Sequence, residues 1–455
     1  MGAPQDDSSI TPTTISFGKQ IRQAHFNFAP SYTPLNHGSF GSSPSNVREH
    51  QRRLQRETEA RPDTFIRFEY PRLLREAREA VAPLLGAETD EVVFVPNALT
   101  AINTVLRNLT YRGGDVIVYF STIYDACHKT IQSLEETTRV RGHCVELVYP
   151  VEDNEILDKF RSAIIEVRSQ GKSVKLALFD TILTFPGVRF PWESLVPICR
   201  EYGILSCIDG AHGIGHIDLR HASQVGPDFF ITNCYKWLMV PRGCTVLYVP
   251  YRNQALIRTT YPTGEGYQPA EHRVEMSERA YFVKLFEKVS TVDTTPYICV
   301  TEALKFRNQV CGGEEKVRNY SVNLAKDGGE LMAAIMGTEV LENRAGTLRD
   351  CFFTNVRLPL DVVTEESQEH QTGKVLARDG QAVADWITKT TVEEYETFIA
   401  TRYYAGAFWV RISSQIYLDR ADFEWAANVL LELCGRVRKG IRPSKQNTMV
   451  DMIVA

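Results

Sequence analysis

Short apolar runs alternate with amphipathic segments between residues 91 and 249. The runs predict strands, which read EVVFV, DVIVYF, CVELVYP, VKLALF, ILSCID, DFFIT and CTVLYV and span residues 91–95, 115–120, 144–150, 174–179, 204–209, 228–232 and 244–249. The segments between them, such as ALTAINTVLRNL and YDACHKTIQSLEETTR, have apolar residues at helical spacing. Strands that alternate with helices are typical of βαβ units, so we expect an α/β fold with a mostly parallel, two-sided sheet.

The pattern changes on both sides of this region. Residues 46–85 are predicted to be helical, and the polar residues 1–16 are predicted to be a disordered tail within an N-terminal segment, 1–30. After residue 298 a helix, two apolar strands (CFFTNVRLPL and AFWVRISSQIY) and a final helix predict a smaller α+β domain. The 455 residues exceed what one core usually serves. We therefore expect a large α/β domain over 31–297 and a small domain over 298–455.

Composition narrows the class of protein. The formal net charge is -5 without a basic run, which disfavours nucleic acid as a partner, and no apolar run is long enough to span a membrane. The first ten residues do not resemble a signal or transit peptide. Ten cysteines are scattered without paired short spacings, so we expect reduced thiols in a cytoplasmic protein. No spacing of cysteines or histidines predicts a metal site.

Polar side chains stand where several predicted strands end, which is the edge where such sheets bind ligands. PNALTAIN opens a helix whose N-terminus suits a phosphate, Tyr124 begins the next helix, Asp209 ends a strand, and Lys236 follows another. Each has a plainer interpretation: a helix cap, core packing, a structural salt bridge and a solvated lysine. Together they match pyridoxal phosphate, because the lysine would form the Schiff base and the carboxylate would pair with the pyridinium nitrogen.

Four segments carry a resemblance to a known family. LNHGSFGSSP, DGAHGIGHIDL, DFFITNCYKWL and VRISSQIYLDRADF resemble the class V aminotransferases, fold-type-I pyridoxal-phosphate enzymes, and within them the isopenicillin-N-epimerase-like branch. The resemblance runs from about residue 17 to the last helix. It implies a large cofactor-binding domain with a seven-stranded sheet, a smaller C-terminal domain, and a homodimer with shared active sites.

The same resemblance assigns roles residue by residue. Lys236 would be the Schiff-base lysine, Asp209 the pyridinium partner, and His212 a contact of the ring face or phenolic oxygen. The backbone N–H groups of Ala98 and Leu99 would hold the phosphate. The side chains of Thr100, Asn233 and Tyr235 would lie near it, and Thr291, in STVDTTPY, would reach it from the partner subunit. Arg411 would clamp the substrate α-carboxylate, where a bidentate guanidinium fits. His37 and Phe40 are further candidates for substrate binding.

Taken over its whole length, the chain resembles the fungal C–S lyases that cleave hercynylcysteine sulfoxide in ergothioneine biosynthesis. This implies β-elimination of a cysteine-conjugate sulfoxide, with Lys236 taking the Cα proton and Tyr124, which would also stack on the cofactor, as first choice of acid. Cys127 and Cys144 are weaker choices, because each is more simply a core side chain. The aromatic residues Phe26, Phe28, Tyr32 and Phe40 lie near LNHGSFG and suit a trimethylammonium group, although such a stripe is more often core.

Three alternatives stay open. An epimerase needs a second base on the opposite face, for which Tyr124 or His37 would serve. A cysteine desulfurase is disfavoured, because no cysteine lies between Cys351 and Cys434 to act from a mobile loop. A non-catalytic binding protein is disfavoured because Lys236, Asp209 and Arg411 are all present.

Overall fold

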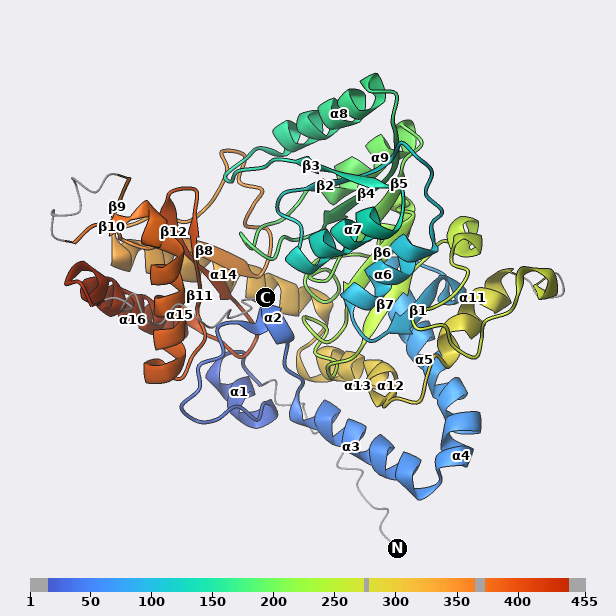
Figure 1. Ribbon diagram of the computed structural model, residues 1–455. Helices are drawn as coiled ribbons and strands as arrows, with labels where there is room; N and C mark the ends of the chain where they lie inside the picture. The colour runs from blue at the N-terminus through green and yellow to red at the C-terminus, as the bar shows by residue number, and fades with distance from the viewer. Residues whose placement is uncertain (1–14, 274–277, 365–372, 442–455) are drawn as a thin grey trace, which may run out of the picture.

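The computed structural model describes residues 15–273, 278–364 and 373–441, so all but the last two residues of the predicted tail lie outside it. Its centre is a seven-stranded sheet with the strand order β1-β7-β6-β5-β4-β2-β3 (Figure 1). The strands are β1 Val92–Val95, β2 Asp115–Phe120, β3 Arg141–Val145, β4 Ser173–Asp180, β5 Leu205–Asp209, β6 Phe229–Asn233 and β7 Thr245–Tyr248. Neighbours are parallel except that β7 is antiparallel to β1 and β6. The predicted mostly parallel, seven-stranded sheet is confirmed.

Helices cover both faces of this sheet. Alternate residues of β4 point to opposite sides: Leu176 and Leu178 belong to one apolar cluster, and Ala177 and Phe179 to the other. The first cluster is completed by α6 (Ala98–Asn108) and α7 (Asp125–Thr137), the second by α8 (Asp153–Ser169) and α9 (Trp192–Glu201). Burial on both faces explains why these strands are continuous apolar runs.

The third strand differs from its prediction. We expected residues 144–150, but β3 is Arg141–Val145 and pairs only with β2 at the sheet edge. Its first residues are polar or only partly buried, so they carry little apolar signal. The apolar residues that follow, Leu147 and Tyr149, are buried outside the sheet. The pattern of apolar residues therefore placed the start of this strand three residues too late.

The helical stretch predicted over residues 46–85 is interrupted. It consists of α3 Ser45–Ala60, α4 Pro62–Thr64, a π-helical turn η1 Phe65–Glu69, α5 Tyr70–Val81 and a 3-10 turn η2 Ala82–Leu85. Pro62 has no backbone N–H to continue α3 and instead begins the next helix. The break lets α3 and α5 run in different directions (Figure 1).

The C-terminal part is built on a second, antiparallel sheet of three strands. Its order is β11-β12-β8, with bounds Ala400–Tyr404, Ala407–Ser413 and Phe353–Arg357. Three helices accompany it: α14 Glu314–Met336, α15 Gly380–Tyr395 and α16 Arg420–Arg438. The first described residues, around α1 (Lys19–His25), lie against this part (Figure 1), where Gly18 N–H donates to Ile416 O at 2.7 Å and Arg22 pairs with Asp422. The α+β character is as expected, and the boundaries at residues 30 and 297 stay predictions.

The remaining elements are short. They are α1 Lys19–His25, α2 His37–Phe40, η3 Thr89–Glu91, α10 Ala222–Val225, η4 Tyr251–Leu256, η5 Ala270–His272, α11 Glu278–Glu287, α12 Thr295–Ile298, α13 Val300–Lys305, η6 Phe306–Val310, β9 Val362–Val363, β10 Val375–Leu376 and η8 Ala377–Asp379. Across the described ranges, no helix combines the length and the apolar character needed to cross a bilayer.

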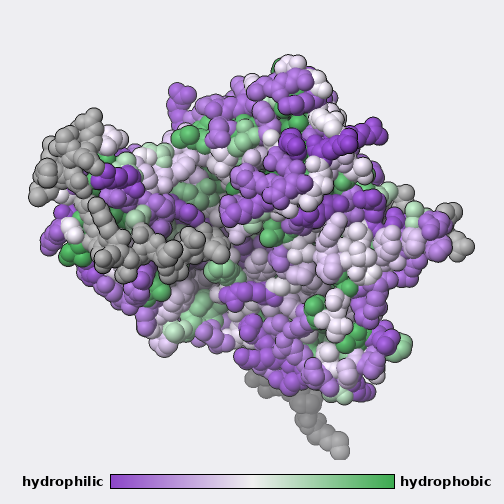
Figure 2. Space-filling model, in the orientation of Figure 1, coloured by the Kyte–Doolittle hydropathy of each residue, from purple (hydrophilic) through white to green (hydrophobic). Residues whose placement is uncertain are grey.

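The surface is largely hydrophilic on the face drawn in Figure 2, with hydrophobic side chains gathered near α4, α5 and α12. Several large apolar side chains of this region and of the segment before α12 are exposed, namely Ile66, Phe68 and Val292. Clusters of exposed apolar side chains are typical of surfaces that bind another protein or a ligand.

Candidate active site

The predicted chemistry gathers at the carboxyl edge of the large sheet. Asp209 ends β5, Asn233 ends β6, and Lys236 lies in the turn between β6 and β7. Parallel strands bring residues that are distant in sequence to one edge, which is why a pattern of strand-end residues predicted a site.

Lys236 is partly buried, and its Nζ lies 3.3 Å from Nε2 of His212. Burial lowers the pKa of the Lys236 amine to about 8, a shift that the negative charge of Asp209 opposes and the positive charge of Arg411 increases. About a tenth of the amine is therefore uncharged at pH 7, far more than for an ordinary lysine, and able to attack a carbonyl carbon.

Asp209 is the buried carboxylate that the sequence predicted, only 3% exposed. Its Oδ1 accepts the Ala211 N–H at 3.0 Å, and Cys127 Sγ lies 3.6 Å from Oδ2. Burial raises its pKa, while the Ala211 N–H, Lys236 and the Cys127 thiol act in the opposite direction. These donors leave lone pairs on Oδ2 for a cationic ring nitrogen.

A second carboxylate, Asp180, was missed by the sequence analysis. It ends β4 directly beside Asp209 in the strand register and is 5% exposed. No described residue donates a hydrogen bond to it, and burial and the charge of Asp209 hold its pKa well above the usual range. Two such neighbours cannot both ionise at low cost, so the negative charge is favoured on Asp209, which accepts the Ala211 N–H and is stabilised by Lys236. The signal was present, since LALFD ends in the same way as LSCID.

The start of α6 forms only part of the predicted phosphate cradle. Asn97 caps the helix by accepting the Thr100 N–H at 2.8 Å, and the Thr100 hydroxyl donates to the same oxygen. The Ala98 N–H, predicted to hold phosphate, instead donates to Asn233 Oδ1 at 3.1 Å, because the strand-end amide reaches across to the helix. The N–H of Leu99 has no acceptor in the described chain and is the group left for an anion.

Arg411 lies on β12 and is almost fully buried. Its guanidinium donates to Thr184 O, to Asn36 Oδ1 at 2.8 Å and to Ser39 Oγ at 3.2 Å, but Nε has no acceptor among the described residues. Burial lowers its pKa to about 10, and no carboxylate of the described chain pairs with it. A buried cation without a counter-ion is a strong candidate for binding a carboxylate ligand.

His37 and Phe40 lie on α2 but differ in surroundings. Nε2 of His37 lies 2.8 Å from Lys236 O and Nδ1 lies 2.7 Å from the Tyr417 hydroxyl, so protein groups already occupy both nitrogens. Burial lowers the pKa of His37 to about 4, so the ring is neutral and holds the lysine turn in place. Phe40 is 58% exposed. Substrate binding by either residue stays a prediction.

The candidate proton donors Tyr124, Cys127 and Cys144 lie at different distances from Asp209. Tyr124 caps α7 and is partly buried, and burial together with Cys127 and Asp209 raises the pKa of its hydroxyl. Tyr235 interacts electrostatically with Tyr124 and Asp209. The pKa of the Tyr235 hydroxyl is raised to about 12, chiefly by burial. Cys144 lies on the edge strand β3, with Sγ 3.4 Å from Glu146 Oε1. Tyr124 and Cys127 are therefore the candidates that the structure brings to Asp209.

The aromatic residues near the N-terminus are mainly packing residues. The rings of Phe26 and Phe28 lie 4.8 Å and 5.0 Å from that of Tyr417, and Tyr32 lies 6.1 Å from Phe28. Phe26, Phe28 and Tyr32 are therefore explained by packing, and only the exposed Phe40 is not.

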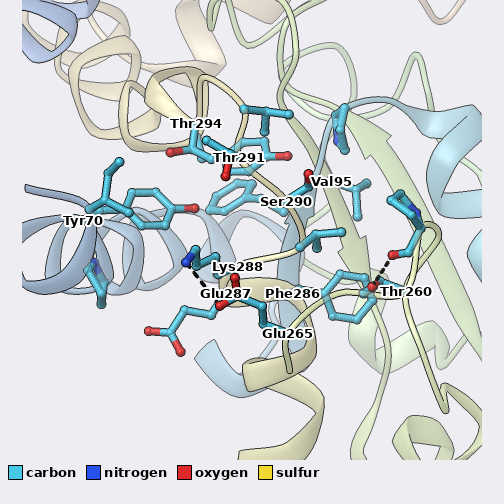
Figure 3. A pocket seen from close by; sticks show the side chains of 18 of the residues that line it. Tyr70, Val95, Thr260, Glu265, Phe286, Glu287, Lys288, Ser290, Thr291 and Thr294 are labelled. Carbon is cyan, nitrogen blue, oxygen red and sulfur yellow. Dashed lines mark hydrogen bonds and ion pairs between the residues drawn. The ribbon is translucent and has the colours of Figure 1, made fainter. Parts of the chain in front are cut away.

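A cavity of about 820 Å³ opens beside the start of α6 (Figure 3). Thr100 and Thr291 line it together with Tyr70, Val95 and Thr260, whereas Lys236 does not. Thr291 itself is exposed. The cavity thus reaches Thr100, at the start of α6, from outside and is not lined by the lysine.

The residues present fit pyridoxal phosphate. An amine of lowered pKa suits the aldehyde, a buried carboxylate suits the ring nitrogen, and a free helix N-terminal amide suits the phosphate. The Arg411 guanidinium, with one buried N–H unsatisfied, suits an α-carboxylate.

The chain is similar to known proteins of one family. The family model described as aminotransferase class-V matches residues 65–424. The chain is 38% identical over 449 residues to the L-cysteine desulfhydrase-like protein lolT1 of Epichloe uncinata, covering 94% of this chain and 98% of that protein. It is 29% identical over 420 residues to the hercynylcysteine sulfoxide lyase of Schizosaccharomyces pombe, covering 92% and 98%.

Solved structures show the same architecture. The cystine C–S lyase C-DES, solved in complex with cysteine persulfide, aligns with a TM-score of 0.68 at 17% identity, covering 88% of this chain and 97% of that one. At this identity the likeness shows the fold alone.

Proposed function

The chain belongs to the aminotransferase class-V family of pyridoxal-phosphate enzymes, and on this premise we propose that it cleaves hercynylcysteine sulfoxide by β-elimination. The relatives named as a desulfhydrase-like protein and a sulfoxide lyase bear out the predicted kind of enzyme, a pyridoxal-phosphate-dependent carbon–sulfur lyase. The observation that carries the proposal is that the site contains both an amine of lowered pKa, that of Lys236, and a buried guanidinium without a counter-ion, that of Arg411.

Each protein group has a defined task in this reaction. Arg411 binds the α-carboxylate of the amino acid and so directs its Cα–H bond toward Lys236, whose amine takes the proton. When bound, pyridoxal phosphate supplies an electron sink for the Cα–H electron pair, and Asp209 stabilises the positive charge of its ring nitrogen. The protonated hydroxyl of Tyr124 donates a proton to the departing sulfur group.

The products follow from the bond that breaks. Cleavage between Cβ and sulfur releases a sulfenate, and the remaining three-carbon unit is hydrolysed to pyruvate and ammonia. The sulfenic acid then needs two electrons, supplied by an added thiol, to reach the thiol level of ergothioneine.

L-Cysteine itself is the second candidate substrate. The desulfhydrase-like relative is 38% identical to this chain, against 29% for the sulfoxide lyase. The same residues would serve, because L-cysteine has the same α-carboxylate and Cα–H bond and differs only in the leaving sulfur.

A substrate panel tests the proposal. Purified enzyme with pyridoxal phosphate and a reducing thiol is given hercynylcysteine sulfoxide, S-methylcysteine sulfoxide and L-cysteine, and pyruvate is followed, with Lys236→Ala as the inactive control. We expect hercynylcysteine sulfoxide to have the highest kcat/KM. If L-cysteine instead releases sulfide and pyruvate with the highest kcat/KM, L-cysteine is the substrate and the proposal of hercynylcysteine sulfoxide is wrong. Racemisation without pyruvate would make the protein an epimerase, and cofactor binding without any turnover would make it a binding protein.

The assembly and location are part of the same proposal. We propose a homodimer in which Thr291 approaches the phosphate of the partner subunit. Exposed Thr291, Val292 and Phe68 around the open cavity support this, because apolar groups beside a functional site suit a second copy. All ten cysteines lie in the described residues as free thiols, which supports the proposed cytoplasmic location.

A further inference from the structure

Trp237 contacts the active-site histidine from the turn that carries Lys236. Its indole Nε1 lies 3.1 Å from Nδ1 of His212, and both side chains are buried. On the other side of the same imidazole ring, Nε2 lies 3.3 Å from Nζ of Lys236. His212 is therefore held between an indole and the amine of Lys236.

These two contacts determine which ring nitrogen of His212 carries a proton. An indole N–H is a donor only, so Nδ1 accepts it and holds no proton. Burial keeps the pKa of His212 well below its ordinary value, and the positive charge of Arg411 acts in the same direction, so the ring is neutral. A neutral imidazole has one N–H, which here must be on Nε2 and face Lys236.

We propose that Trp237 is a positioning residue whose indole N–H holds His212 in the tautomer that donates from Nε2 toward Lys236. That donation needs the lone pair of an uncharged amine, because an ammonium group has no lone pair to accept it. The arrangement thus favours the nucleophilic form of Lys236. It concerns the amine alone and does not depend on which substrate the enzyme takes.

Trp237 also has a packing role, which must be separated from this one. Its ring lies 4.3 Å from that of His216 and 5.4 Å from that of Phe352. Trp237→Phe preserves an aromatic ring in the core but removes the N–H. Trp192 is the matched control: it is also fully buried, and its Nε1 has no acceptor among the described residues. Trp192→Phe removes the same atoms without breaking a hydrogen bond to the site.

The first measurement needs no substitution in the protein that is tested. Ring-nitrogen NMR shifts of isotope-labelled histidine, recorded on the wild-type enzyme with and without pyridoxal phosphate, report where each imidazole proton lies. The signal of His212 is assigned by its loss in His212→Asn. We expect a proton on Nε2 and none on Nδ1. A proton on Nδ1 in the cofactor-free protein overturns the proposal.

The variants test whether Trp237 is the cause. Trp237→Phe should allow a population with the proton on Nδ1. It should also raise the pH midpoint for the rate at which cofactor-free enzyme gains its visible absorption by roughly half to one pH unit, the value of one hydrogen bond. Trp192→Phe should match the wild type in both measurements, even if its stability falls. If Trp237→Phe keeps the wild-type tautomer and midpoint, Trp237 acts by packing alone and the proposal fails. If the variant does not fold, the wild-type NMR result decides.

Discussion

At the scale of single residues, the lowered pKa of Lys236 makes cofactor loading depend on pH. Only the uncharged amine attacks an aldehyde, so the rate at which cofactor-free enzyme gains its visible absorption should rise about tenfold per pH unit and level off near pH 8. Asp209→Asn should move this midpoint to lower pH, because the carboxylate stabilises the charged amine. A midpoint near the ordinary lysine value of about 10.4 would show that burial does not control this amine.

Tyr124 is the second residue whose role can be isolated. Tyr124→Phe keeps the ring but removes the proton donor, so cofactor affinity should be retained while kcat for the sulfoxide falls by roughly 100- to 10,000-fold. Cys127→Ser is the comparison, because Cys127 contacts Asp209 from the same helix. If Cys127→Ser loses as much turnover as Tyr124→Phe with normal cofactor binding, the assignment of the acid moves to the thiol.

At the scale of elements, one buried arginine on η6 holds the turn of Lys236. Arg307 is fully buried, donates to Trp237 O at 2.8 Å and to Gly215 O at 3.1 Å, and pairs with Glu314 at the start of α14. It thereby connects the large sheet to the C-terminal helices. Without it, two carbonyl groups and a carboxylate would be left without partners.

Arg307→Met should accordingly lower the free energy of unfolding by about 3–5 kcal/mol, measured in urea, and weaken cofactor binding. Arg357→Met is the matched control, since Arg357 pairs with Glu339 in solvent at the end of β8. That change should cost less than about 1 kcal/mol. Equal losses in the two variants would mean that the buried network adds nothing beyond an ordinary surface pair.

At the scale of the whole molecule, complementation between two inactive chains tests the shared site. Lys236→Ala has an intact Thr291, and Thr291→Ala has an intact Lys236. If Thr291 acts across the interface, a heterodimer purified through two tags should contain one complete site and recover about half of the wild-type activity. If Thr291 serves its own chain, the heterodimer should be no better than the Thr291→Ala homodimer. A monomer in sedimentation would end the dimer proposal directly.

The sequence allowed the positions of several candidate site residues to be predicted, because these residues follow strands that are buried on both faces. Lys236 and Asp209 were placed correctly at the sheet edge from local pattern alone. Asp180 was missed although its strand ends in the same way, because no motif pointed to it. The edge strand β3 was misplaced because an edge strand needs no continuous apolar run.

By itself, the sequence determined the alternation of strands and helices, the edge at which polar groups collect, and the family, since these depend on residues close together along the chain. Only the tertiary structure decided what each side chain faces. Ala98 meets Asn233, His37 meets Lys236 and Tyr417, and Trp237 meets His212. These partners are separated by 135, 199, 380 and 25 residues. A hydrogen bond depends on distance and direction in space, and no spacing along the chain encodes them for groups brought together by folding.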